Sequence, residues 1–304
     1  MNPMLSPVRW PCEAIWQALE PLLPGFTVEV LPEVDSTNSE LMRRARAGQT
    51  DPVLLVTERQ TAGRGRLGRQ WVSGSAAHAV ASVGDQGFTA GPPQGETAPP
   101  GGSAAHAVAS VGAIPSLTFS LGLNLAPTDW SGLSLAVGLS VAQSLHPDLV
   151  LKWPNDLWWH DRKLAGILIE TANCAATSAS RYVVIGIGIN LLAPQSTGLS
   201  TAPAGLEELM PGVDASQALL QIAAPLVHTV QTFEARGFAP FVSAFNQRDA
   251  LAQVAVTLSD GVQGVAQGVD ATGALLVATP KGVQRVTSAE VSVRLQEGPR
   301  YDQL

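Results

Sequence analysis

Two of the three lysines in this chain lie in one short stretch, KWPNDLWWHDRKLAGILIE, which runs from residue 152 to residue 170. The other positive charges are 15 arginines, a bias that replaces lysine wherever arginine serves equally well. Lysine is a compact, mobile point charge, whereas arginine is a planar fork, so a crowded site that needs a small cation retains lysine. Lys152 and Lys163 are therefore candidates for chemistry. The plainer alternative is two surface lysines that lie close together by chance.

The same stretch places an amide and a carboxylate, Asn155 and Asp156, beside Lys152. Such oxygens suit Mg²⁺, which is bound by one or two protein groups together with substrate phosphates. With the lysines, they indicate nucleotide chemistry. The alternative is an Asn/Asp turn flanked by structural lysines, and spacing alone does not separate the two.

A second basic segment, RQTAGRGRLGRQW, spans residues 59–71 and alternates arginines with glycines. Glycine lets backbone approach a ligand closely, and guanidinium forks match phosphate and carboxylate oxygens. The segment fits neither a P-loop nor a dinucleotide-binding fingerprint. It is typical of a loop that wraps an anion, although a solvated basic loop has the same composition.

The elements expected around these residues define an α+β fold, a mixed β-sheet covered by helices. Asp35, Ser36 and Thr37 can cap a helix that Gly48 ends. Hydrophobic periodicity predicts strands at 27–31, 51–58, 116–125, 149–153 and 181–192, a hairpin at 157–170, and helices at 12–23, 131–145, 215–235 and 238–248.

From about residue 250 the pattern changes to short alternating strands with tight turns, which is typical of a small β-barrel. We therefore expect two domains, residues 1–248 with the candidate site and residues 249–304 with the barrel. Residues 74–114 interrupt the first domain. The segment GSAAHAVASVG occurs at 74–84 and again at 102–112, which predicts a duplicated, mostly disordered loop.

Bulk composition narrows the function classes. A net charge of -7 and a pI near 5.2 argue against general nucleic-acid affinity. There is no apolar run long enough for a membrane span, and the N-terminal residues lack a secretory pattern. The two cysteines, Cys12 and Cys174, have no metal-binding spacing. We expect a cytoplasmic protein without nucleic-acid or membrane partners.

The motifs DSTN, GRGRLGRQW, KWPNDLWWHDRKLAGILIE, GIGIN and GVDATGALLV together resemble those of biotin protein ligases, in the same order. The resemblance covers residues 27–73 and 115–295. It implies a catalytic domain like that of biotin ligases and class II aminoacyl-tRNA synthetases, with an SH3-like C-terminal barrel. The implied reaction joins biotin to ATP as biotinyl-5'-AMP and passes the biotin to a carrier-protein lysine.

The resemblance also implies roles for residues. The catalytic set is Lys163, Arg64, Arg66 and Asp156. The biotin set is Ser36, Thr37, Asn38, Gln60, Gly63, Arg64, Arg66, Lys163 and Gly166. The ATP and adenylate set is Arg64, Arg66, Arg69, Trp71, Lys152, Asn155 and Asn190, and Mg²⁺ would be held by Asn155 and Asp156.

The implied partner is a biotin carboxyl carrier protein of acetyl-CoA carboxylase or a related carboxylase, and a homodimer is a further expectation. DSTN begins at residue 35, which leaves no room for the DNA-binding domain of bifunctional members, so we expect no repressor activity. The repeat stands where the family has a short turn beside the biotin site. Two alternatives remain at this point, a lipoate or octanoate ligase of the same fold and a biotin-binding sensor that has lost catalysis.

Overall fold

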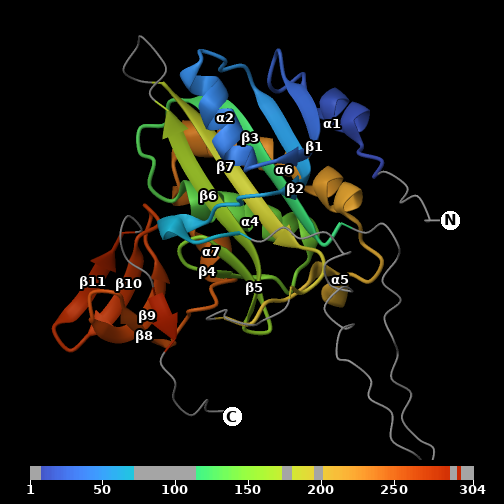
Figure 1. The fold of residues 1–304 in the computed structure, drawn as a ribbon. Helices are drawn as coiled ribbons and strands as arrows, with labels where there is room; N and C mark the ends of the chain where they lie inside the picture. Colours follow the sequence, from blue (N-terminus) through green and yellow to red (C-terminus); the bar gives the residue numbers. More distant parts are fainter. Residues whose placement is uncertain (1–7, 72–113, 173–179, 195–200, 288–292, 296–304) are drawn as a thin grey trace, which may run out of the picture.

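The computed structural model describes residues 8–71, 114–172, 180–194, 201–287 and 293–295 (Figure 1). Its centre is a seven-stranded sheet in the order β1-β2-β3-β7-β6-β5-β4. The strands are β1 (Thr27–Val34), β2 (Val53–Gln60), β3 (Ser116–Leu125), β4 (Val150–Lys152), β5 (Asp156–Trp159), β6 (Arg162–Ala172) and β7 (Arg181–Asn190). β1 and β2 pair in parallel and all other neighbours pair antiparallel, which confirms the predicted mixed sheet.

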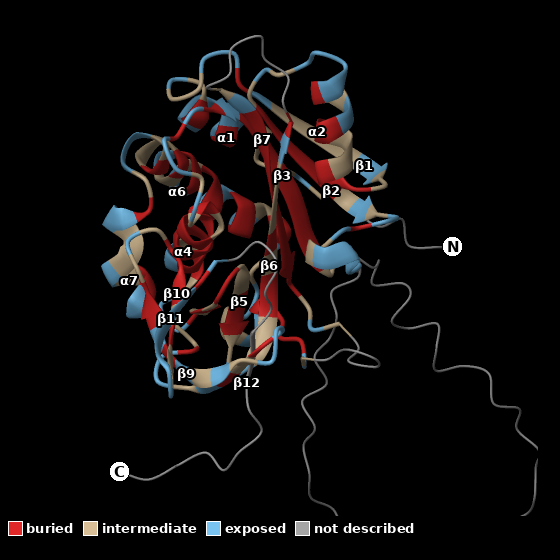
Figure 2. Ribbon diagram, turned by 90° about the vertical axis from the view of Figure 1, so that its left-hand side faces the viewer, coloured by how far each residue is buried: buried red, intermediate tan, exposed pale blue. Residues whose placement is uncertain are grey.

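Helices cover both faces of this sheet (Figure 2). One face carries α1 (Cys12–Leu19), α4 (Leu133–Leu145) and α6 (Ala215–Arg236), which share the main hydrophobic core with the strands. The opposite face carries α2 (Thr37–Arg46), whose Leu41, Met42 and Ala45 pack against a smaller apolar cluster. Strands β3 and β7 are thus covered on both sides, which explains why their sequences read as nearly continuous apolar runs.

Helix α2 begins where the sequence predicts. Ser36 is its N-cap, and the Ser36 side chain accepts a hydrogen bond from the Ser39 amide at 3.4 Å. Gly48 follows the helix with a positive φ of 88°, a conformation that glycine adopts without steric cost. The cap places the DSTN residues at the junction between β1 and the helix.

A row of paired residues, named the glycine row after Gly166 and Gly188 at its centre, crosses the sheet beneath α2. Residues paired across neighbouring strands point to the same face, and Leu55, two positions before Thr57 on β2, packs in the apolar cluster under α2. The row therefore lies on the α2 face. From one edge inward it consists of Lys152, Asp156, Gly166, Gly188, Thr118 and Thr57.

The C-terminal unit is a five-stranded antiparallel sheet in the order β11-β10-β9-β8-β12. Its strands are β8 (Ala255–Leu258), β9 (Gln263–Val269), β10 (Leu275–Thr279), β11 (Gly282–Val286) and β12 (Val293–Leu295). The small antiparallel unit is confirmed, while the pairings recorded for the described residues do not close it into a barrel. Its buried residues join the main core of the larger sheet.

Short elements are where the sequence predicted least. The segments η1 (Arg66–Gly68) and α5 (Leu206–Leu209) were not expected. The helix expected at 238–248 is instead two pieces, η2 (Ala239–Phe241) and α7 (Val242–Asn246). The duplicated segment lies outside the described residues. In the parts of the chain that the structure describes, every helix falls short of the length or the apolarity that a membrane crossing requires.

Candidate active site

The centre of the candidate site is an ion pair between Lys163 and Asp156. The Lys163 Nζ donates to Asp156 Oδ1 at 2.7 Å. The two side chains retain 31% and 16% of their exposure, so the pair is accessible to a ligand yet shielded. Asp156 begins β5 and faces Gly166 on β6, while an irregular register between the two strands pairs Lys163 with Trp158.

Lys152 lies beside this pair on β4, opposite Asp156. Its ammonium sits 4.7 Å from the centre of the Trp158 ring, a cation–π contact. Burial lowers the pKa of Lys152; the Asp156 carboxylate opposes this, and the charges of Lys163 and Arg69 lower it further. The structure therefore brings the two lysines together at Asp156.

Arg66 adds a third cation at the same point. Its Nη1 donates to Asn155 Oδ1 at 3.4 Å. Burial lowers the pKa of Arg66, with Asp156 opposing and Arg69 adding to the shift. The Asn155 amide in turn donates to the Ile167 carbonyl at 2.8 Å, and the Ile167 amide donates to the Asn155 carbonyl at 3.0 Å.

The basic segment of residues 59–71, the arginine loop, contains a small hairpin that crosses the α2 face of the sheet. The Trp71 amide donates to the Gly63 carbonyl at 2.9 Å, and the Gly65 amide donates to the Arg69 carbonyl at 2.7 Å. The Trp71 ring rests on the glycine row, where a Cβ on Gly188 would lie only 2.4 Å from its Cε2. Within the described residues, the buried Trp71 Nε1 has no hydrogen-bond partner, so it remains a donor that a ligand oxygen could use.

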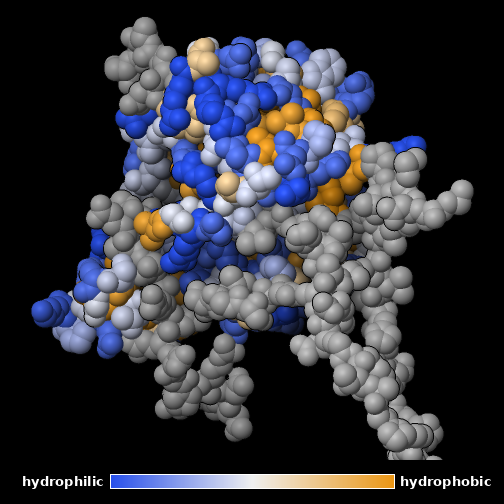
Figure 3. Space-filling model, viewed as in Figure 1, coloured by the Kyte–Doolittle hydropathy of each residue, from blue (hydrophilic) through white to orange (hydrophobic). Residues whose placement is uncertain are grey.

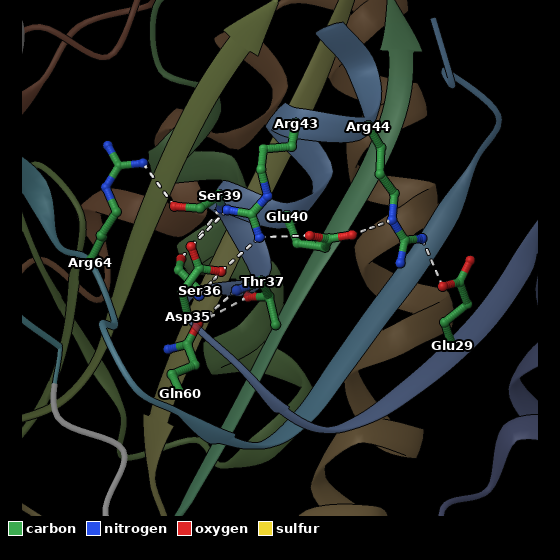
Figure 4. A network of polar contacts seen from close by, with 10 residues as sticks. All are labelled: Glu29, Asp35, Ser36, Thr37, Ser39, Glu40, Arg43, Arg44, Gln60 and Arg64. Carbon is green, nitrogen blue, oxygen red and sulfur yellow. Dashed lines mark hydrogen bonds and ion pairs between the residues drawn. The ribbon is translucent and has the colours of Figure 1, made fainter. Parts of the chain in front are cut away.

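Arg64 points elsewhere than Arg66. Its Nη2 donates to Glu170 Oε1 at 3.0 Å. Its Nη1 donates to Ser39 Oγ at 3.3 Å, a contact drawn in Figure 4. The structure therefore brings Arg66, Lys152 and Lys163 together at Asp156 but places Arg64 against β6 and the start of α2. Hydrophilic side chains gather over α2 and around this loop on the same face (Figure 3).

A buried cluster of polar side chains, the polar cluster, lies at the N-terminus of α2. The Gln60 Oε1 accepts from the Thr37 amide at 2.9 Å, and the Ser120 hydroxyl lies 2.7 Å from both Thr37 Oγ1 and Asn38 Oδ1. The Asn38 amide donates to the Leu168 carbonyl and to Glu170 Oε2, at 3.1 and 3.0 Å. Because all these groups satisfy one another, a ligand that enters must offer both donors and acceptors.

Ion pairs hold α2, the helix that carries part of this polar cluster. Arg43 contacts Asp35 and Glu40, and Arg44 contacts Glu40 and Glu29, all at 2.7–2.8 Å (Figure 4). The hydrogen bond from Arg43 holds the pKa of Asp35 below its ordinary value. The pairs are partly exposed, so each contributes little to stability. Their effect is to tie α2 to β1 and to the turn before it.

Asn190 ends β7 with its side chain turned to the backbone. Its amide donates to the carbonyls of Ala204, at 3.1 Å, and Lys163, at 3.4 Å. The Lys163 backbone also pairs with Ala202 and Ala204. Asn190 thus anchors the main chain of Lys163, and its expected place beside an adenylate stays a prediction.

Sequence reasoning missed several residues of this site. Glu170 holds both Arg64 and Asn38, and Ser120 joins Thr37 to Asn38. Gly186 makes room for Asn38, since a Cβ there would lie 2.0 Å from Asn38 Oδ1. The available signals were the acid at the end of the apolar run KLAGILIE and the glycine that opens GIGIN, whereas the serine carried none.

The fold and the comparison with family models point to one class, the biotin and lipoate protein ligases. Residues 113–190 match the Biotin/lipoate A/B protein ligase family, and residues 253–294 match the Biotin protein ligase C terminal domain.

Individual relatives narrow the class. The chain is 30% identical to the bifunctional ligase/repressor BirA of Escherichia coli, over 90% of this chain and 76% of that protein. It is 29% identical to the biotin--[acetyl-CoA-carboxylase] ligase of Paracoccus denitrificans, over 86% and 98% respectively. The biotin protein ligase of Aquifex aeolicus, solved in complex with biotin and ATP, has the same fold, with a TM-score of 0.64, 24% identity, and coverage of 88% of this chain and 99% of that one. The chain belongs to the biotin protein ligase family.

Proposed function

We propose that this chain activates biotin with ATP and transfers it to a lysine of a biotin carboxyl carrier protein. The observation that carries the proposal is the contact of Lys163 with Asp156 at 2.7 Å. Asp156 belongs to the glycine row, with the cations Lys152 and Arg66 beside it and the polar cluster of α2 further along the sheet. This reaction needs polar groups that bind the ureido ring of biotin and a cationic cluster that binds the biotin carboxylate and the ATP phosphates.

The polar cluster favours biotin over lipoate as the substrate. A ureido ring presents two N–H donors and one carbonyl acceptor, whereas a dithiolane ring presents neither. The Thr37, Asn38, Gln60 and Ser120 side chains are hydrogen-bonded to one another, and a ureido ring can replace those hydrogen bonds with its own. An apolar ring that separated them would leave buried polar groups unpaired, at about 1–3 kcal/mol per group. Ser36 serves here as the helix cap that fixes the other groups.

In the first step, a biotin carboxylate oxygen attacks the α-phosphorus of ATP, and pyrophosphate leaves. Two anions must meet, so positive charge aimed at the junction stabilises the transition state. Lys163 reaches this junction from β6, Arg66 from the arginine loop, and Lys152 from β4. Arg64, which contacts Glu170 through a half-exposed ion pair, exchanges that carboxylate for a substrate oxygen at low cost.

In the second step, the carrier lysine attacks the acyl carbon, and AMP leaves. The incoming amine must lose a proton to attack. Asp156 is the acid in contact with Lys163 and the natural acceptor or orienting group for that amine.

Magnesium fits the site as a companion of ATP. Asp156 lies among the cations Lys152, Lys163 and Arg66, and Asn155 already engages Arg66 and Ile167 through its side chain. Within the described residues there is no group of three acidic, His or Cys side chains for a metal. Mg²⁺ would therefore arrive with the triphosphate, with Asp156 and Asn155 as the protein ligands, and would neutralise phosphate charge.

The domain boundary in this proposal follows residue 248, after the strands of the larger sheet and before those of the smaller one. Residues 1–248 form the catalytic domain, and residues 249–304 form a C-terminal domain that supports it. Carrier proteins of acetyl-CoA carboxylase or related carboxylases are the expected acceptors.

Pyrophosphate release tests the proposal most simply. With magnesium and ATP, the protein should release pyrophosphate when biotin is added. Lipoate or octanoate should give a rate at least about tenfold lower, because neither can replace the hydrogen bonds of the polar cluster that it would disrupt. Preference for lipoate would assign the chain to the sister activity. Tight biotin binding without release would assign it to a sensor.

A further inference from the structure

Trp153 connects the candidate site to the C-terminal sheet. It precedes the turn of Pro154, Asn155 and Asp156, and it is 1% exposed. Its Nε1 donates to the Gly273 carbonyl at 3.1 Å, a contact between residues 120 positions apart in the chain. The site turn is therefore joined to the turn between β9 and β10.

The β9–β10 turn is built around Asp270. The Asp270 Oδ1 accepts from the Thr272 amide, the Thr272 hydroxyl and the Ala274 amide, at 2.9, 2.8 and 3.1 Å. Arg285, on β11, donates to its other oxygen. Burial raises the pKa of Asp270, but these hydrogen bonds outweigh it and hold the pKa at about 2. The carboxylate that shapes the turn thus stays charged at neutral pH.

The turn also packs closely on the larger sheet's helix layer. Gly273 has a φ of 80°, and a Cβ there would lie 2.8 Å from the Gly132 Cα and 3.0 Å from Leu135 Cδ1. Two residues after Gly132, the Ser134 hydroxyl donates to the Pro154 carbonyl at 3.0 Å. The β9–β10 turn and the start of α4 thus contact Trp153 and Pro154, the two residues that directly precede Asn155 and Asp156.

We propose that Trp153 and the Asp270–Gly273 turn are positioning residues for adenylate formation. They hold Asn155 and Asp156 against Arg66 and Lys163, so the C-terminal sheet sets the geometry of the reacting cluster. This inference rests on the proposed function. The polar cluster of α2 contacts β2, β3 and β6, not the C-terminal sheet. Biotin binding should therefore not depend on the contact between Trp153 and Gly273.

Trp153→Phe tests the connection, because it removes the Nε1 donor and keeps an aromatic ring. Trp16→Phe is a matched control, since Trp16 Nε1 donates to the Phe26 carbonyl at the same 3.1 Å on α1. In pyrophosphate release, Trp153→Phe should lower kcat about tenfold or more through misplacement of the reacting groups. Its dissociation constant for biotin should stay within about twofold of the parent's, and Trp16→Phe should match the parent in both.

A second pair of variants approaches the same contact from the C-terminal sheet. Asp270→Asn weakens the β9–β10 turn, and Asp260→Asn is its control, because Asp260 caps the β8–β9 turn through a single bond to the Val262 amide at 3.1 Å. Asp270→Asn should lower kcat, and Asp260→Asn should not. The double variant Trp153→Phe/Asp270→Asn should lose less than the sum of the two, since both act through one contact.

Hydrogen exchange provides a readout independent of activity. Amides of residues 155–157 should exchange about tenfold faster in Trp153→Phe than in Trp16→Phe, because the turn opens more often. Equal kcat in the two Trp variants, or a parallel loss of kcat and biotin affinity, would overturn the inference. A parent without biotin-dependent release rejects the proposed function instead, and equal exchange in the two variants would then reject the connection on its own.

Discussion

At the scale of residues, lysine and arginine occupy different positions for a physical reason. The Lys163 ammonium meets Asp156 at 2.7 Å, and Lys152 lies against the Trp158 ring, both in confined places on the sheet. Arg64 and Arg66 extend from the loop, and their planar forks donate to Glu170 and Asn155. The scarcity of lysine in the rest of the chain thus pointed to two residues that the structure places around one carboxylate, and their roles in the reaction stay predictions.

Glu170 offers a prediction at the same scale. Glu170→Ala removes the acceptor for both Arg64 and Asn38, whereas Glu170→Gln keeps an oxygen for Asn38 and loses only the charge that faces Arg64. Calorimetry should show biotin binding weakened about five- to thirtyfold in Glu170→Ala and less in Glu170→Gln, from bonds worth about 1–2 kcal/mol.

The matched partner change is Arg64→Ala. Combined with Glu170→Gln it should be less harmful than the two single effects added, because both remove one ion pair. Parental biotin affinity in Glu170→Ala would contradict the role given to this acid.

Individual residue contacts were only partly predictable. The helix cap at Ser36 follows from local chemistry and is confirmed. The partners of Asn38 and Arg64 are not local, since Glu170 lies 132 and 106 positions away from them. Such contacts follow from strand order, which the sequence alone does not specify.

At the scale of elements, the long strands and helices were predictable because each buries a whole face. β3 was expected at residues 116–125 and is observed as Ser116–Leu125. Short pieces such as α5 and η1 have too few residues for a periodic pattern, and tertiary contacts decide them. The glycine row became visible only with the register of β5, β6 and β7.

The junction between α7 and β8 carries a pH prediction. The Asp249 backbone segment pairs with Leu151, and its Oδ1 accepts from the Leu251 amide at 2.9 Å. Within the described residues its buried Oδ2 has no hydrogen-bond partner. Burial raises the pKa of Asp249 from 3.8 to about 6, against the opposing bond from Leu251.

Because the folded state holds this proton more tightly than the unfolded state, the free energy of unfolding should fall as pH rises from 3.8 to about 6. Asp249→Asn removes that dependence, so its melting temperature should exceed the parent's at pH 7 and approach it at pH 4. Melting curves across this range test the point. Parallel parent and variant curves would contradict it.

At the scale of the whole molecule, two sheets share one core, and the chain between Trp71 and Ile114 carries the exact duplication. Deleting residues 74–101 leaves one copy of GSAAHAVASVG. Shortening a long connection changes its closure entropy by only about 1 kcal/mol or less, so pyrophosphate release should stay within about twofold of the parent. A loss of more than about tenfold would make the duplicated segment part of the catalytic apparatus.

The central claim is that the Lys163–Asp156 cluster joins biotin to ATP. The measurement that tests it most directly is biotin-dependent pyrophosphate release by the parent and by Lys163→Ala, side by side, with biotin binding measured for both. We predict release by the parent and a loss of at least about a hundredfold in the variant, with the fold intact. Release by Lys163→Ala at near the parental rate would contradict the account.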